Sequence, residues 1–196
     1  MQNIKIRFKG WLGEAGVKIF GALGLPATKY HKFHNVTIPN EYTKSTSQID
    51  HIIVSRYGVF VVETKMMTGW IFGSEYDKQW TQKFPSKSFK FQNPLRQNYG
   101  HIKALQEILT DIPEEVFENI ISMCGEHKIK TAMPKNVTRG AWYISYIRSF
   151  KTVRLTDQQV ALAVEAIKTN RLPDNAETKK QHIANIKQNN NKSVEQ

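Results

Sequence analysis

The sequence has little cysteine and no long apolar run. Its 196 residues include one cysteine, Cys124, so neither a disulfide within the chain nor a zinc site built from cysteines is possible. This cysteine usage fits a cytoplasmic location. No run approaches the roughly 18 apolar residues of a membrane-spanning helix, and residues 1–20 are basic without a sustained apolar core. We therefore expect no membrane anchor and no signal peptide.

Acidic residues are missing from two long stretches. Residues 78–106 contain five Lys and one Arg, and residues 127–156 contain four Lys and three Arg, without Asp or Glu in either stretch. The formal net charge of the whole chain is +11. Such regional asymmetry suits a polyanionic partner, and nucleic acid is the first candidate. The alternative is a generally basic protein, because composition alone does not separate the two.

Residues 48–65 predict a β-hairpin. The runs 49–55 and 59–64 are rich in β-branched residues, as strands are. Between them lies a short segment that ends in Gly58, which can take a positive φ. A two-residue loop at positions 56 and 57 gives a register in which apolar side chains face each other. The predicted pairs are Val54 with Val59, Ile52 with Val61 and Asp50 with Glu63.

This register brings two carboxylates and an amine together on one face. Asp50 and Glu63 would lie roughly 5 Å apart and repel each other unless a positive charge lies between them. A divalent cation such as Mg²⁺ meets that need, and Lys65 reaches the same point, where it can orient a water or stabilise developing charge. The alternative is a surface ion-pair cluster. Because both strands are otherwise apolar, we expect this face to point inward, where an unpaired charge is costly.

The hairpin belongs to a longer ordered pattern. Its blocks are Gly13-Glu14, Gln48-Ile49-Asp50-His51-Ile52, Gly58 to Lys65, Gly69-Trp70-Ile71 with Trp80, and Asn93-Pro94 with Gln97. This pattern resembles the NERD (nuclease-related) domain of the PD-(D/E)xK superfamily, clearly over about residues 10–110 and weakly to about 170. Glu-x-Lys alone is a weak signal, whereas the ordered set of blocks is a strong one.

The resemblance implies a restriction-endonuclease-like α/β fold, with a mixed central β-sheet flanked by α-helices. We expect this domain to cover residues 1–172. Residues 173–196 are rich in Asn, Gln and Lys, and we expect a polar, flexible tail with at most a frayed helix at 176–188.

The resemblance also implies a metal-dependent nuclease. Asp50 and Glu63, supported by Glu14, would bind Mg²⁺ or Mn²⁺, and Lys65 would assist the attacking water. For Glu14 the alternative is a first-turn residue that complements the helix dipole. Residues expected to contact substrate are Gln48, Gln97, Lys78, Lys90 and Arg96. The substrate is nucleic acid, with DNA expected ahead of RNA, and a partner protein or a homodimer stays open.

The remaining pattern predicts the elements around the hairpin. We expect strands at 33–39, 70–73, 78–82, 88–91 and 116–123, a turn at 40–47, and helices at 11–24, 94–109 and 156–170. Residues 141–150 suit either a helix or a strand. Asn93 and Thr156 are the expected N-caps of the second and third helices.

Several side chains keep two interpretations. The aromatic residues Trp80, Phe84, Phe89 and Phe91 alternate with lysines and suit either the core or base stacking. Tyr99 falls on the apolar stripe of the 94–109 helix. His101 on that helix could act as a base, but we expect it to be half-exposed and without a role. His34 has no evident partner.

Two other functions compete with the nuclease. A binding module of the same fold would hold nucleic acid without cutting it, but buried carboxylates that repel phosphate argue against this. A protein-interaction adaptor would use its tail and aromatic surface, and would have no affinity for nucleic acid at low salt.

Overall fold

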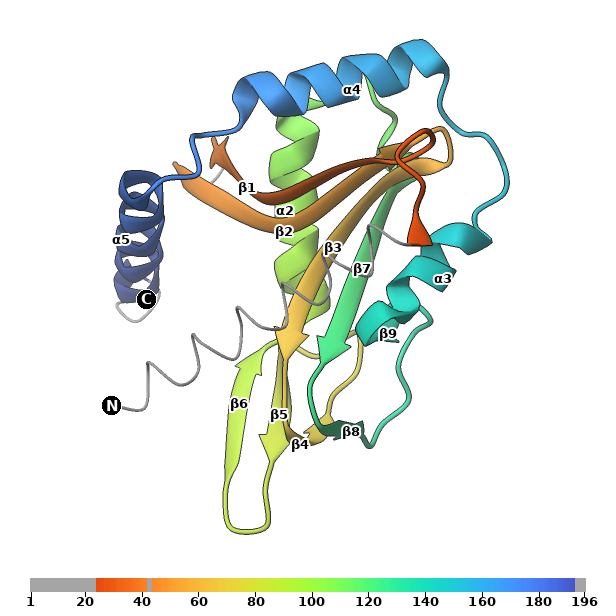
Figure 1. Ribbon diagram of the computed structural model, residues 1–196. Helices are drawn as coiled ribbons and strands as arrows, with labels where there is room; N and C mark the ends of the chain where they lie inside the picture. Colours follow the sequence, from red (N-terminus) through yellow and green to blue (C-terminus); the bar gives the residue numbers. More distant parts are fainter. Residues whose placement is uncertain (1–23, 42–43, 193–196) are drawn as a thin grey trace.

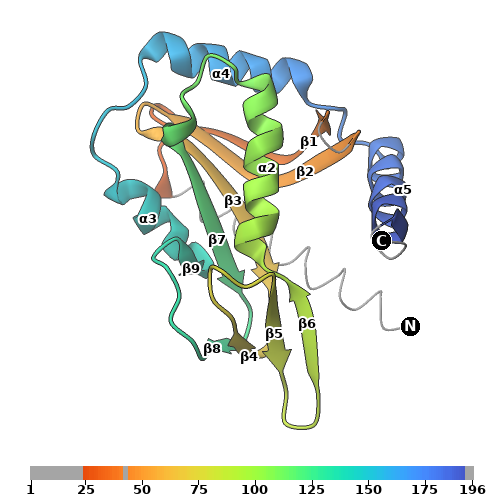
Figure 2. The same cartoon turned by 180° about the vertical axis from the view of Figure 1, so that it is seen from behind.

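The computed structural model describes residues 24–41 and 44–192, and contains two β-sheets with helices around them (Figures 1 and 2). The larger sheet has the order β1-β2-β3-β7-β9 and the smaller one the order β6-β5-β4-β8. This is the mixed α/β architecture that the sequence predicts. The strands of the larger sheet are β1 His31–Asn40, β2 Ser45–Ser55, β3 Gly58–Met66, β7 Phe117–Cys124 and β9 Val137–Arg139. Those of the smaller sheet are β4 Gly69–Phe72, β5 Gln79–Lys83, β6 Ser88–Gln92 and β8 His127–Ile129.

Helices cover both faces of the larger sheet. They are α2 Pro94–Ile108, α3 Tyr143–Ser149, α4 Asp157–Asn170 and α5 Ala176–Lys192, with 3₁₀ turns at Glu114–Val116 and Gly140–Trp142. Along β3, Val59 and Val61 belong to the core that contains α2 residues, whereas Phe60 and Val62 belong to the core that contains α3 residues. Since neighbouring strand residues point to opposite faces, α2 and α3 lie on opposite sides of the sheet. Figure 1 shows α2 behind the sheet.

The β2–β3 hairpin has the predicted register. Val54 pairs with Val59 and Ile52 with Val61, and Gly58 has the expected positive φ, 144°. The ladder continues to the pair of His51 with Val62 and does not include a pair of Asp50 with Glu63. Beyond this hairpin β3 pairs with β7 in parallel, so that β3 lies in the middle of the sheet.

The first hairpin is longer than predicted. Strand β1 spans 31–40 and β2 begins at Ser45, so the polar segment 40–47 is only partly a turn. Its residues pair across the ladder down to Asn40 with Ser45, and the side chain of Asn40 donates to Ser47 Oγ at 2.9 Å. His34 also has a partner that the sequence did not reveal, because its Nδ1 lies 2.7 Å from Nδ1 of His51 on the neighbouring strand. Polar residues whose local sequence predicts a turn therefore form cross-strand hydrogen bonds instead.

Helix α2 is anchored to the sheet by amide side chains. Asn93 caps it by accepting a hydrogen bond from the Leu95 N–H at 2.9 Å, as predicted. Asn98 is fully buried and donates to the carbonyl of Val61 on β3 at 2.8 Å and to Oδ1 of Asn119 on β7 at 2.8 Å. The apolar stripe is narrower than expected, because the Tyr99 side chain is exposed. These contacts fix the position of α2 against β3.

The C-terminal part of the described chain is helical. In the ambiguous segment 141–150, residues 143–149 form helix α3. Thr156 caps α4 as predicted, and together with Gln159 it forms a capping box. Helix α5 runs to Lys192. The sequence predicted at most a frayed helix over residues 176–188, so the helix is longer than predicted. It lies beside the end of the sheet where β1 leads into β2 (Figure 1). The predicted helix at 11–24 lies outside the described residues, except for Gly24.

We predict that Asn98→Ala lowers the free energy of unfolding by about 2–4 kcal/mol, because it leaves buried acceptors on β3 and β7 without a donor. The matched control is Asn170→Ala on α4, whose amide donates to the Ala166 carbonyl at an exposed position. That change should stay within about 0.5 kcal/mol. Urea unfolding followed by circular dichroism measures both, and equal losses would contradict the anchoring role.

Candidate functional site

A cluster of polar side chains lies between the end of β3 and the first half of α2. Glu63 and Lys65 are two apart on β3 and therefore share a face. Gln97 and His101 are four apart on α2 and therefore share a helix side. Asn98 docks α2 against β3, and the two pairs of side chains meet there.

Glu63, Lys65 and Gln97 form a closed ring of contacts. Lys65 Nζ lies 2.7 Å from Glu63 Oε1 and donates to Gln97 Oε1 at 2.7 Å. Gln97 Nε2 donates to Glu63 Oε1 at 2.8 Å. The Gln97 amide thus uses its oxygen for the cation and its nitrogen for the carboxylate, an orientation that both neighbours favour.

This ring compensates a buried charge. The Glu63 side chain is 5% exposed and the Lys65 side chain 23% exposed. A carboxylate withdrawn from water to this degree needs both an opposite charge and hydrogen-bond donors, and the ring supplies them. The burial of Glu63 agrees with the prediction that the charged cluster faces inward.

His101 belongs to the same cluster. Its Nε2 lies 3.6 Å from Glu63 Oε2, and its side chain is 14% exposed. The expectation that His101 is half-exposed was therefore wrong. The spacing of four from Gln97 was the available signal, but only the docking of α2 shows which side of the helix faces the carboxylate.

Burial lowers the pKa of His101 below its ordinary value of 6.5. The nearby Glu63 carboxylate opposes this by raising the pKa, while the Lys65 ammonium and His182 on α5 lower it further. Because burial is the largest cause, His101 is neutral at pH 7 and can accept or donate a hydrogen bond through either ring nitrogen, depending on its tautomer.

Asp50 approaches the cluster from β2. Its Oδ2 accepts a hydrogen bond at 2.8 Å from the N–H of Thr64, the residue after Glu63, so the Asp50 carboxylate lies at the seam between β2 and β3. Gln48, two residues earlier, is partly buried and pairs in the ladder with Thr37 on β1. It shares the face of Asp50, as predicted.

Helix α5 reaches the same edge of the sheet. His182 Nδ1 lies 2.8 Å from the Thr46 hydroxyl on β2, and Thr178 is buried. Thr46 precedes Asp50 by four residues and points to the same face. The segment expected to be a tail thus contacts the strand that carries Asp50.

The other predicted substrate residues lie outside this cluster. Arg96 Nη2 donates to the Tyr76 carbonyl at 2.8 Å, and Lys78 and Lys90 are exposed around a shallow depression on the smaller sheet. None of these three makes a hydrogen bond or ion pair to Glu63 within the described part of the chain. Glu14 lies outside the described residues.

Among the described residues at this edge, the carboxylates of Asp50 and Glu63 can hold a cation. Over residues 24–41 and 44–192, no three His, Cys, Asp or Glu side chains converge as a metal-binding group. Mg²⁺ is commonly bound by one or two protein carboxylates, with waters and substrate phosphate oxygens completing its coordination. The donor set at this edge is of that kind.

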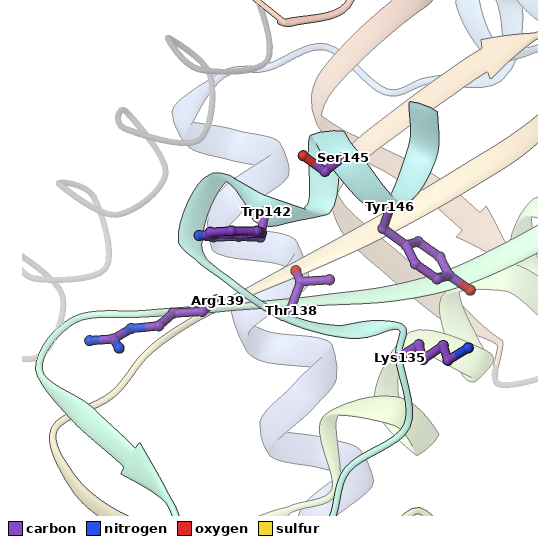
Figure 3. A pocket seen from close by; sticks show the side chains of 6 residues that line it. All are labelled: Lys135, Thr138, Arg139, Trp142, Ser145 and Tyr146. Carbon is purple, nitrogen blue, oxygen red and sulfur yellow. The ribbon is translucent and has the colours of Figure 1, made fainter. Parts of the chain in front are cut away.

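A basic surface lies at the edge of the larger sheet, near β9 and α3. An open depression is lined by Lys135, Thr138, Arg139, Trp142, Ser145 and Tyr146 (Figure 3). The Trp142 side chain is 72% exposed, and Figure 3 shows Arg139 and Lys135 extending from different parts of its rim. No acidic residue lines it.

Comparison with known proteins agrees with this architecture. The model of the nuclease-related domain family, NERD, matches residues 9–124. The chain is also 38% identical over 167 residues to a Bacillus anthracis protein described as uncharacterized. This alignment covers 80% of the chain and 76% of that protein. The chain therefore belongs to the nuclease-related domain family, as its motifs suggested. No solved structure matches it. Among the described helices, none has the length and apolar character needed to cross a membrane.

We predict that His101 titrates below pH 6.5 in buffer free of divalent metal, because burial disfavours its charged form. Glu63→Gln should lower this pKa further, and Lys65→Met should raise it. A lowered pKa in the folded state means that neutral His101 adds stability above pH 6.5, which is lost as the pH falls through the folded-state pKa. NMR titration of the imidazole resonances measures these shifts, and shifts in the opposite directions would contradict the assigned causes.

Proposed function

We propose that this protein is a divalent-metal-dependent nuclease that hydrolyses phosphodiester bonds in nucleic acid, with DNA expected ahead of RNA. The supporting observation is the buried Glu63 carboxylate, which contacts Lys65 and Gln97 beside Asp50 at the end of β3. A member of a nuclease-related family with this arrangement has the carboxylates and the amine that phosphodiester hydrolysis requires.

In this proposal Asp50 and Glu63 hold Mg²⁺ or Mn²⁺, with Glu14 as a third carboxylate. The ion, when bound, polarises the scissile phosphate and lowers the pKa of a coordinated water. Lys65 would orient the attacking water or stabilise the negative charge that develops on the phosphate. Gln97 keeps Lys65 and Glu63 in register, because its amide contacts both.

His101 has a positioning role in the same scheme. As a buried, neutral group 3.6 Å from Glu63 Oε2, it restricts where that carboxylate can point. Gln48 extends the site along β2, where its amide can donate to a phosphate oxygen. Lys78, Lys90 and Arg96 would attract the nucleic acid from the side of the smaller sheet, so binding should weaken steeply with salt. Because the chain has one cysteine and therefore no internal disulfide, we place this activity in the cytoplasm.

One observation favours a second candidate, a binding module that does not cut. The Glu63 carboxylate already has an ammonium and an amide donor from the chain itself, so the cluster is stable as an ion-pair network. In that case nucleic acid would bind, and neither Mg²⁺ nor Mn²⁺ would change the protein or the ligand.

We predict metal-dependent cleavage of labelled single-stranded, duplex or flapped DNA, or of RNA, in Mg²⁺ or Mn²⁺ and none in EDTA. Glu63→Gln and Lys65→Ala should each lower the rate by about 100-fold or more, because each removes a group from the reacting centre. The matched controls are Glu165→Gln and Lys168→Ala, an exposed pair on α4 whose charged atoms are 3.5 Å apart. Cleavage that survives in both site variants would exclude this active site, and binding without any cleavage would establish the binding module.

We also predict that Asp50→Asn and Glu63→Gln weaken Mn²⁺ binding by at least about 10-fold, because each removes a charged ligand. Isothermal titration calorimetry with Mn²⁺ measures this without a substrate. The control is Asp157→Asn, at an exposed position beside Arg56. Unchanged Mn²⁺ affinity in both site variants would place the metal elsewhere.

A further inference from the structure

The smaller sheet has one buried and one solvent-facing side. Ile71, Trp80 and Ile129 pack on Leu95 of α2 and on Ile121 and Met123 of β7. This settles one interpretation of the aromatic residues, because Trp80 is fully buried and belongs to the core. The opposite side contains the alternate residues of each strand. We call this solvent-facing side the outer face.

A tryptophan lies at the centre of the outer face. Trp70 on β4 pairs across the ladder with Lys83 on β5 and with Lys128 on β8, and paired residues lie on the same side of a sheet. Lys130 Nζ lies 5.6 Å from the centre of the Trp70 ring. Three lysines from two segments of the chain, β5 and the end of β8, therefore lie around one indole. The next row is Phe72, Thr81 and Lys90.

The outer face is strongly basic. Strands β4, β5, β6 and β8 contain no Asp or Glu, and the nearest acids in sequence, Asp77 and Glu126, are in the turns that precede β5 and β8. None of the salt bridges among the described residues uses Lys83, Lys90, Lys128 or Lys130. The positive charge of this face is therefore available to a partner. Trp70 is 39% exposed, and a base that stacks on its ring would displace the Lys130 ammonium, which can then turn to a flanking phosphate.

We infer that the outer face binds an unpaired stretch of nucleic acid, with a base stacked on Trp70 and the flanking phosphates contacted by Lys83, Lys128 and Lys130. This inference rests on the proposed function, and it specifies the substrate as a single strand, an overhang or a flap. An indole among cations matches an exposed base and its phosphates. In a duplex the bases are stacked on each other, so that only the lysine contacts would remain.

The outer face lies next to the candidate active site along the chain. Trp70 follows Lys65 by five residues, so the backbone between them spans at most about 18 Å. Strand β3 leads into β4 and β7 into β8, and both pairs stay parallel across the bend. Figures 1 and 2 show the smaller sheet at the ends of β3 and β7, beside the start of α2. A strand bound on the outer face needs only a few nucleotides to reach Lys65.

Glycines allow this close arrangement. Gly69 has φ 77°, and a Cβ there would lie 2.8 Å from the Lys83 carbonyl oxygen. Gly125 has φ 85°, and a Cβ there would lie 2.4 Å from the Met67 carbonyl oxygen. Because both bends require positive φ and a close backbone approach, they fix the smaller sheet relative to β3 and β7.

The test measures binding without cleavage. Fluorescence anisotropy of a labelled 20-nucleotide single strand and of a blunt duplex of the same sequence is followed in EDTA, with Glu63→Gln as background. Trp70→Ala should weaken single-strand binding by about 5- to 100-fold, the range for losing one stacked base, and duplex binding by less than 2-fold. Trp70→Phe should retain most of the affinity, because it keeps an aromatic face.

The control is Trp142→Ala, which removes an exposed indole from the depression in Figure 3. It should leave single-strand affinity within 2-fold. Equal effects of Trp70→Ala and Trp142→Ala, or equal losses with single strand and duplex, would overturn the inference. Thermal unfolding of each variant shows whether it is folded. If Trp70→Ala does not fold, Trp70→Phe still allows the test.

The lysines give an independent readout. The logarithm of the association constant for the single strand falls linearly with log salt, and Lys83→Gln and Lys128→Gln should each make this slope less negative by about 0.7. Lys168→Gln on α4 should leave that slope unchanged. An unchanged slope in the first two variants would contradict phosphate contacts on the outer face.

The inference and the proposed nuclease can fail separately. Binding that depends on Trp70, without cleavage of any substrate by the wild type in Mg²⁺ or Mn²⁺, would support the outer face and reject the nuclease. Cleavage that Trp70→Ala leaves unchanged, together with unchanged single-strand affinity, would support the nuclease and reject the outer face as its substrate-binding surface.

Discussion

The contact between Glu63 and Lys65 is the interaction on which the candidate site depends. A carboxylate that is nearly withdrawn from water loses several kcal/mol of hydration, and it stays ionised only if the protein replaces that hydration. Lys65 supplies the opposite charge and Gln97 supplies a directed hydrogen bond. Gln97 is held in place by the docking of α2, to which Asn98, the next residue, contributes hydrogen bonds to β3 and β7. The position of helix α2 and the stabilisation of the buried Glu63 carboxylate therefore depend on each other.

The same strands connect the site to the outer face. In the larger sheet β3 and β7 run parallel, and after one bend their continuations β4 and β8 run parallel in the smaller sheet. The inner side of the smaller sheet completes the core around Ile121 and Met123, so it cannot shift without disturbing the strand next to Glu63. A basic surface attached in this way has a fixed geometry relative to the candidate reacting centre, which favours positioning of a bound strand.

Helix α5 links residues that are far apart in the sequence. Its His182 contacts Thr46 on β2, and it is close enough to His101 to lower the pKa of that imidazole. In composition the segment resembles a disordered tail, since it is polar and lacks aromatic residues. A few contacts to a strand edge are enough to hold such a helix, and these contacts cannot be read from composition.

By itself, the sequence determined the local structure of this protein. The register of the β2–β3 hairpin followed from the alternation of Val54, Ile52, Val59 and Val61, because a slip of one residue would turn every apolar side chain to the wrong face. The caps at Asn93 and Thr156 followed from hydrogen bonds between near neighbours in sequence. The order of the motifs determined the family.

The tertiary structure decided everything that depends on how separate elements meet. His101 was expected to be half-exposed and is largely buried beside Glu63, because the docking of α2 determines which side of the helix is buried. Tyr99 fell on the apolar stripe and is exposed for the same reason. The grouping of Lys83, Lys128 and Lys130 around Trp70 joins residues up to 60 positions apart. Such long-range pairings are selected by the shared core beneath them, and local pattern carries no information about that core.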